Sequence, residues 1–215
     1  MVKHSESGFT LVEFLIAAAI MTAVLGGTMS LATQMQRAYS TQLEDVSAQQ
    51  EGRFALDWIA RAFRSAGSNA YSIVTSPCPA ANTAFQAIRL DPNGNGIQDD
   101  VRIQADINPS NGLLTGTGGG CNTNPEPGED ITISQSGLVI MKQDNRVGGI
   151  SEPMTDPIFT SLRFTYLDAG RVATAVAASI AYAQISVTVR SRAPNPNTGV
   201  YPTTTLQSEV RLRAR

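Results

Sequence analysis

One stretch near the N-terminus constrains this chain more than any other. Residues 8–31, GFTLVEFLIAAAIMTAVLGGTMSL, are apolar over about the 20 residues that a helix needs to cross a bilayer, and Glu13 is the only charged residue among them. A short polar leader, MVKHSESG, precedes the stretch. A secretory signal has a shorter apolar region with its small-residue cleavage site on the far side. Here the small residue, Gly8, comes first, so the order predicts a membrane helix rather than an ordinary secretory signal.

The residues around Gly8 carry a family resemblance. Gly8, Phe9 and Glu13, in the run GFTLVE, resemble the type III signal of type IV prepilins and pseudopilins. The resemblance implies that a prepilin peptidase cuts between Gly8 and Phe9, removing residues 1–8, and that Phe9 becomes an N-methylated N-terminus. The alternative is an ordinary N-terminal membrane anchor in which this run is accidental.

Glu13 is the second part of the resemblance. An acid inside a membrane helix costs about 2.5–3.5 kcal/mol on insertion scales, so it needs a partner or a function. In the family, a glutamate at the fifth mature position meets the N-terminal amine of a neighbouring subunit, and Glu13 takes this position if Phe9 is the first mature residue. The resemblance therefore implies that Glu13 sets the register between subunits, with its charge neutralised in the apolar filament core.

No helix breaker follows the apolar stretch. Residues 34–66 contain no proline and only one glycine, Gly52. One helix can therefore run from Phe9 to about Ala66, a length of about 87 Å at 1.5 Å per residue.

The two halves of this expected helix differ in pattern. Residues 9–35 form a hydrophobic half for the membrane or the filament core, and residues 36–67 form an amphipathic half that ends at Gly67 as a C-cap. In the second half, apolar residues at three- and four-residue spacing predict a buried stripe. Its members are Ala55, Trp58, Ile59, Ala62, Phe63 and Ala66.

The block GRFALDWIARAFRSAG, residues 52–67, makes the resemblance more specific. It is similar to the end of the first helix in minor pilins of the PilW type. It is similar, less closely, to the J-type pseudopilins of type II secretion.

After Gly67 the helical period stops and β-like runs follow. The last three runs alternate apolar and polar residues, which is typical of half-buried strands. We expect residues 68–215 to form one β-rich globular domain, and the chain to have the α+β pilin fold, with one long helix packed on an antiparallel sheet. The expected strands are residues 72–75, 87–90, 101–104, 131–134, 138–142, 158–167, 184–192 and 203–212.

Two cysteines, Cys78 and Cys121, lie in this expected domain. In an exported domain an even pair suggests one disulfide. The bond would close a loop of about 43 residues, worth about 3–4 kcal/mol in the chain-entropy model. Two unpaired buried thiols are the alternative.

The run DPNGNGIQDD, residues 91–100, resembles the front of a calcium loop of EF-hand or thrombospondin type. Oxygen-bearing side chains stand at relative positions 1, 3, 5 and 9, with glycine at 6. The bidentate acid of the twelfth position is missing, although Asp100 could replace it. The alternative is a plain Asn-Gly turn between strands. The expected ligands of a weak calcium site are Asp91, Asn93, Asn95, Asp99 and the backbone carbonyl of Ile97.

The sequence shows no catalytic constellation. Its only histidine, His4, lies in the leader, and there is no Gly-x-Ser-x-Gly motif, P-loop or Cys/His metal cluster. A net charge of −2 and a pI of about 5.4 give no electrostatic case for a nucleic-acid partner. We therefore expect a structural protein rather than an enzyme, with no required cofactor and calcium as the one candidate ion.

The resemblance implies a minor pilin, a structural subunit of a type IV pilus that primes assembly or contributes to adhesion at the tip or surface. Lys3 leaves the leader in the cytoplasm by the positive-inside rule, so the subunit would lie in the inner membrane with its C-terminal domain in the periplasm before it enters the filament. Its expected partners are the prepilin peptidase and other pilin subunits, through the N-terminal helix. The alternatives are a J-type pseudopilin of type II secretion and a membrane-tethered periplasmic ligand-binding module.

Overall fold

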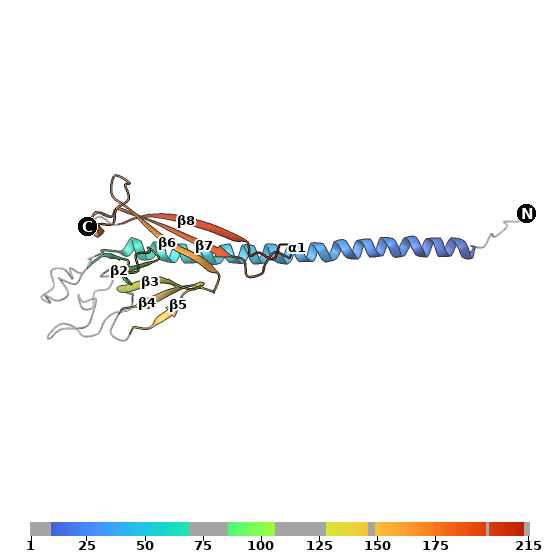
Figure 1. Cartoon of the computed structure of the whole chain (residues 1–215), viewed down its shortest axis with the longest axis horizontal. Helices are drawn as coiled ribbons and strands as arrows, with labels where there is room; N and C mark the ends of the chain where they lie inside the picture. The colour runs from blue at the N-terminus through green and yellow to red at the C-terminus, as the bar shows by residue number, and fades with distance from the viewer. Residues whose placement is uncertain (1–9, 69–85, 106–127, 146–148, 197, 213–215) are drawn as a thin grey trace, which may run out of the picture. The chain divides into compact units, whose positions relative to one another are not determined.

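The computed structural model describes residues 10–68, 86–105, 128–145, 149–196 and 198–212. Within these ranges the chain forms one long helix, α1 (Leu11–Ser65), followed by strands β1 to β8 (Figure 1). The chain divides into two compact units, Met1–Glu44 and Asp45–Arg215.

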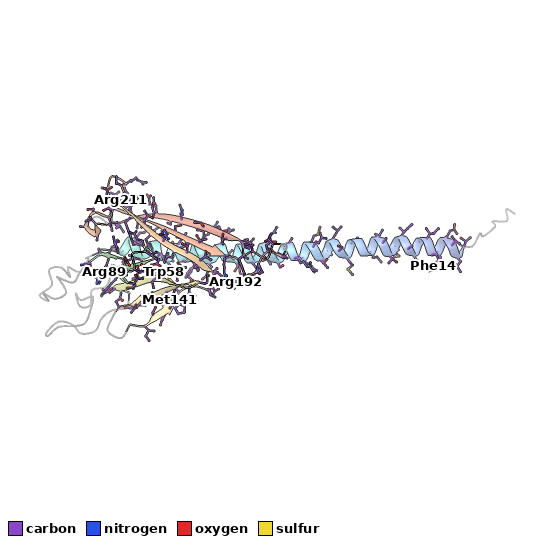
Figure 2. The ribbon with its side chains drawn as sticks, viewed as in Figure 1. Phe14, Trp58, Arg89, Met141, Arg192 and Arg211 are labelled. Atoms are coloured by element: carbon purple, nitrogen blue, oxygen red, sulfur yellow. The ribbon has the colours of Figure 1, made fainter. Side chains whose placement is uncertain are left out.

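In the first unit, residues 11–31 of α1 are apolar except for Glu13 and a few hydroxyl side chains, and they form no polar face. Phe14, Leu15 and Ile16 are consecutive, so they point in different directions around the helix, and all three are more than half exposed. Phe14 projects freely from the helix in Figure 2. A helix with no polar face belongs in a hydrophobic core or a membrane. Among the described residues, α1 is the one helix that is long and apolar enough to cross a membrane, and its most apolar window is wholly exposed.

The polar side chains in this part of α1 satisfy their own hydrogen bonds. The Thr22 hydroxyl donates to the Ala18 carbonyl at 2.7 Å, and the Thr28 hydroxyl donates to the Leu25 carbonyl at 2.9 Å. Such back-bonding lets hydroxyl groups enter lipid, where an unpaired donor is costly. The helix also continues without interruption through Gly26 and Gly27.

In the second unit, the strands form two antiparallel sheets. The five-stranded sheet has the order β1-β2-β3-β4-β5, and the three-stranded sheet has the order β6-β7-β8. A short 3-10 helix, η2 (Ala177–Ser179), lies between β6 and β7. The strand bounds are β1 Ile88–Leu90, β2 Asp100–Gln104, β3 Asp130–Ser136, β4 Val139–Asp144, β5 Ser151–Pro153, β6 Phe159–Leu167, β7 Tyr182–Arg190 and β8 Thr203–Arg211.

The C-terminal part of α1 packs against both sheets, and Figure 1 shows it running between them. Phe63 is fully buried, and its ring lies 5.6 Å from the ring of Phe164 on β6. On the other side, Trp58 lies beneath the ammonium group of Lys142 on β4, 5.7 Å from ring centroid to nitrogen. The core of this unit therefore combines one helix face with the inner faces of both sheets.

At Gly52, α1 lies close to the three-stranded sheet. A Cβ at this position would lie 2.7 Å from Leu206 Cδ1 and 3.2 Å from Val189 Cγ1. The only glycine in the second half of the helix thus allows a close contact with β7 and β8, at the cost of some helix propensity.

The expected α+β architecture is confirmed, with two corrections. The strands form two sheets rather than one, and the short edge strand β5 was not predicted. The predicted buried stripe of the helix is confirmed, except that Trp58 is only partly buried. Gly67 has a φ of 73°, as its predicted C-cap role requires. The expected strand at residues 72–75 lies outside the described residues.

Candidate functional site

The start of α1 is organised around Glu13. The backbone N–H of Thr10 and its hydroxyl both donate to Glu13 Oε2, at 2.9 and 3.0 Å. In return, the backbone N–H of Glu13 donates to Thr10 Oγ1 at 3.3 Å. Thr10 precedes the first helical residue and Glu13 is the third residue of the helix, so the pair forms a capping box.

This contact gives Glu13 a partner inside its own helix. The carboxylate satisfies donors at the helix N-terminus, where negative charge is favoured by the helix dipole. Sequence reasoning identified Glu13 but missed Thr10, although the Thr-x-x-Glu spacing before an apolar run is itself the signature of a capping box. The expected cleavage site, Gly8–Phe9, lies outside the described residues, and so do Cys78 and Cys121.

The 91–100 loop connects β1 to β2, which pair so that Leu90 lies opposite Val101. Asp91 accepts two backbone N–H groups, from Asn95 at Oδ1 (3.0 Å) and from Gly96 at Oδ2 (2.8 Å). Asn93 Oδ1 also accepts the Asn95 N–H, at 2.8 Å. Two of the expected ligands, Asp91 and Asn93, therefore accept hydrogen bonds from the same backbone nitrogen, that of Asn95.

The rest of the loop continues this pattern. Asn95 Oδ1 accepts the backbone N–H of Ile97 at 2.7 Å, and the Asn95 amide nitrogen lies 3.5 Å from Asp99 Oδ1. Gly94 and Gly96 both have φ values above 70°, a conformation that glycine adopts without strain.

Asp100, the first residue of β2, is the buried acid of this region. Its Oδ2 accepts the Asn93 N–H at 3.0 Å, and only 2% of the residue is exposed. Burial, with a further contribution from the charges of Asp91 and Asp99, raises the pKa of Asp100, against the opposing effect of the Asn93 hydrogen bond. Burial, and then the charge of Asp100, likewise raises the pKa of Tyr166 on β6.

A second buried acid, Asp130, has a structural role. Its carboxylate accepts two hydrogen bonds from the guanidinium of Arg102, at 2.7 and 2.6 Å, and one from the Gln104 amide at 2.9 Å. The Asn145 amide donates to it as well, at 3.0 Å. The hydrogen bond to Asp130 also raises the pKa of Arg102. With its oxygens occupied in this way, Asp130 serves to tie β2 to β3.

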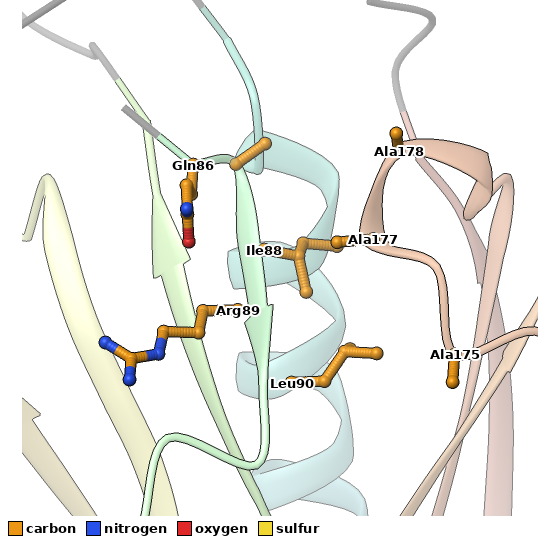
Figure 3. Close-up of a pocket in the computed structure, with 8 residues that line it drawn as sticks. Gln86, Ile88, Arg89, Leu90, Ala175, Ala177 and Ala178 are labelled. Atoms are coloured by element: carbon orange, nitrogen blue, oxygen red, sulfur yellow. The ribbon is translucent and has the colours of Figure 1, made fainter. Parts of the chain in front are cut away.

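A groove of about 550 Å³ lies between β1 and the segment around η2. Figure 3 shows Ile88 and Leu90 pointing toward Ala177 and Ala175 across it, while Arg89 points the other way. Its walls bring no set of polar groups together. Across the described ranges, no three His, Cys, Asp or Glu side chains are arranged to hold a metal ion by themselves.

Comparison with protein-family models gives one finding at the N-terminus. The prokaryotic N-terminal methylation motif matches residues 3–29. Searches of curated proteins and of solved structures give no match to the chain. The motif implies processing by a prepilin peptidase, and the exposed apolar helix fits membrane anchoring. The N-terminal segment therefore carries a prepilin-type signal, which indicates a type IV pilin-like or pseudopilin-like protein.

Proposed function

We propose that this chain is a minor pilin, a structural subunit that joins a type IV pilus through its N-terminal helix. The observation that carries the proposal is the start of α1, where the methylation motif, a single acid in an apolar run and a wholly exposed apolar stretch of helix coincide. Such a helix needs an apolar environment on every side. A membrane provides it before assembly, and a bundle of the N-terminal helices of other pilin subunits provides it in a filament.

In this proposal the globular unit lies in the periplasm while the helix is in the inner membrane, and later on the filament surface. Priming of assembly or adhesion at the tip follows from the similarity of residues 52–67 to PilW-type minor pilins. A J-type pseudopilin would use the same helix in a secretion pseudopilus. A tethered ligand-binding module would keep the helix in the membrane.

The test is fractionation of the native host strain. Filaments are sheared from cells with and without the prepilin peptidase, and the chain is detected in the sheared and membrane fractions. The proposal expects the processed chain in sheared pili and the uncut chain in membranes when the peptidase is absent. Processed chain that stays in the membrane of piliated cells would contradict it. Chain that disappears from the sheared fraction when secretion genes, but not pilus genes, are deleted would favour the pseudopilin.

Glu13→Ala is expected to insert into the membrane normally but to enter filaments at least about tenfold less well in competition with wild type. Loss of one partner of a buried charge pair costs about 2–5 kcal/mol, and about 1.4 kcal/mol already corresponds to tenfold. Quantitative immunoblotting of sheared filaments measures the ratio.

Two further variants separate the charge of Glu13 from its capping role. Glu13→Gln keeps an acceptor that can cap the helix but removes the charge, so it is expected to fail like Glu13→Ala. Thr10→Val removes the hydroxyl that bonds Glu13 but keeps the charge, so it is expected to enter filaments better than either. Full incorporation of Glu13→Gln would show that the cap, and not a pairing with a neighbour's amine, is what matters.

We also propose that Cys78 and Cys121 form a disulfide in the exported protein. Peptide mapping without reducing agent is expected to recover the two cysteine peptides as one linked species. Replacing both cysteines with serine should lower the free energy of unfolding by about 3–4 kcal/mol. Recovery of both thiols in the free state from periplasmic protein would contradict the bond.

A further inference from the structure

The 91–100 loop is built so that side-chain oxygens point into it. Asp91, Asn93 and Asn95 each use a side-chain oxygen to accept a backbone N–H from within the loop. A carboxylate or amide oxygen has a second lone pair after accepting one hydrogen bond. The same hydrogen bonds that fix the path of the loop therefore leave these oxygens able to bind a cation.

An independent observation comes from Asp100, the last residue of the loop and the first residue of β2. Its Oδ1 is fully buried, and no donor among the described residues forms a hydrogen bond with it. Its other oxygen, Oδ2, accepts the Asn93 N–H at 3.0 Å, so one oxygen of the carboxylate contacts the loop. A buried carboxylate oxygen without a partner is costly. A cation held at the loop would supply the missing partner.

The charges of the region favour a cation over a water molecule. Residues 91–100 contain three aspartates and no lysine or arginine. The nearest arginine on β2, Arg102, is bound to the Asp130 carboxylate by two hydrogen bonds. It is thus engaged in a separate network rather than in the loop.

We propose that the 91–100 loop and the buried Asp100 carboxylate together bind one calcium ion. Asp91, Asn93 and Asn95 supply side-chain oxygens, Ile97 its carbonyl, and Asp100 takes the place of the acid that usually closes such loops. Asp99 lies beside Asn95 and contributes directly or through water. Calcium accepts six to eight oxygen ligands in flexible geometry, whereas magnesium demands a near-ideal octahedron. With two neutral amide ligands, the dissociation constant is expected near 10⁻⁴–10⁻³ M.

The ion would act on the junction of the two sheets. The loop enters from β1 and leaves into β2 of the five-stranded sheet, while its Gln98 carbonyl accepts the backbone N–H of Phe164 on β6 at 2.8 Å. Holding the loop therefore holds a link between the two sheets. This role does not depend on whether the chain enters a filament.

The test uses the full chain in a non-ionic detergent, with thermal unfolding followed by near-UV circular dichroism. Calcium at ten times its dissociation constant is expected to raise Tm by about 3–5 °C for a unit of this size. Magnesium chloride at the same concentration should produce less than half of that shift. Luminescence of Tb³⁺, which replaces calcium, gives a direct reading of binding and should be competed away by calcium.

The variants Asp91→Asn and Asp100→Asn are expected to abolish the calcium-dependent shift in Tm. Asp168→Asn is the matched control, because Asp168 also caps a turn, by accepting the Val172 N–H at 2.9 Å, but belongs to a different loop. Its shift should equal that of wild type. No shift in wild type at several millimolar calcium would overturn the proposal, as would a full shift in Asp91→Asn. Because Asp91 lies in the turn rather than in a strand, this variant keeps the test decisive even if Asp100→Asn fails to fold.

Discussion

Replacing Phe63 with alanine is expected to destabilise the globular unit by about 3–5 kcal/mol, the range typical of a buried Phe→Ala change. The Phe63 ring is fully buried and lies 5.6 and 6.3 Å from the rings of Phe164 and Tyr166. Its removal leaves a cavity between α1 and β6 and removes two aromatic contacts. For a unit of this size the expected drop in Tm is about 10 °C or more. Thermal unfolding of the full chain in detergent measures it.

The same helix offers a matched control. Phe54 is 50% exposed and lies on the outer side of the amphipathic half. Phe54→Ala removes the same atoms from the same element, yet it should change the free energy of unfolding by no more than about 0.5 kcal/mol, as is usual for surface positions. Equal losses in the two variants would show that the packing of α1 on the sheets does not stabilise the unit in the way described.

The helix and its buried face could be predicted because their causes are local. Apolar residues recur at helical spacing up to Ala66, no proline interrupts them, and Gly67 supplies the left-handed residue that ends the helix. The strands with strict alternation were likewise predictable. Ile185, Val187 and Val189 are all buried, as their period of two requires.

The division into two sheets could not be predicted in this way. Alternation within a strand says which face is buried, but not which strands share a sheet, since that depends on contacts between distant residues. β5 was missed because Ser151–Pro153 is short, exposed and ends in proline, features of an edge strand that carry no apolar signal.

The candidate site at the start of the helix was predictable only in part. Glu13 was predictable from its place in the prepilin-like run GFTLVE, and its cost in lipid supports the same assignment. The resemblance implies a partner in a neighbouring subunit, whereas the partner in the structure, Thr10, lies in the same helix start. In the 91–100 loop, the spacing of oxygen-bearing residues was visible in the sequence. The burial of Asp100 was not, because it depends on how segments distant in the sequence pack together and not on residue spacing.

Gly8→Val is expected to leave every copy of the chain with residues 1–8 attached. The bond between Gly8 and Phe9 must enter a peptidase within the membrane, and a glycine beside that bond presents no side chain and a permissive backbone. Valine adds a branched side chain, which restricts the backbone and adds bulk beside the bond that the peptidase must bind. Without cleavage, Phe9 never carries a free amine, so a neighbour's Glu13 has no positive group to meet. The variant should therefore be absent from filaments as well as uncut.

The intact mass of the chain isolated from the membrane fraction tests this prediction. Wild type should have lost the mass of residues 1–8 and gained one methyl group at Phe9, and Gly8→Val should have done neither. Gly27→Val is the matched control, because it makes the same change in the same segment where an added Cβ meets nothing within 4 Å. It should be cut normally, since the bond at Phe9 is untouched. Cleavage of Gly8→Val would show that the cut site does not require glycine at this position. A wild-type chain that retains residues 1–8 would remove the basis for filament entry, because the pairing of Glu13 with a neighbour's amine requires that amine to be released first.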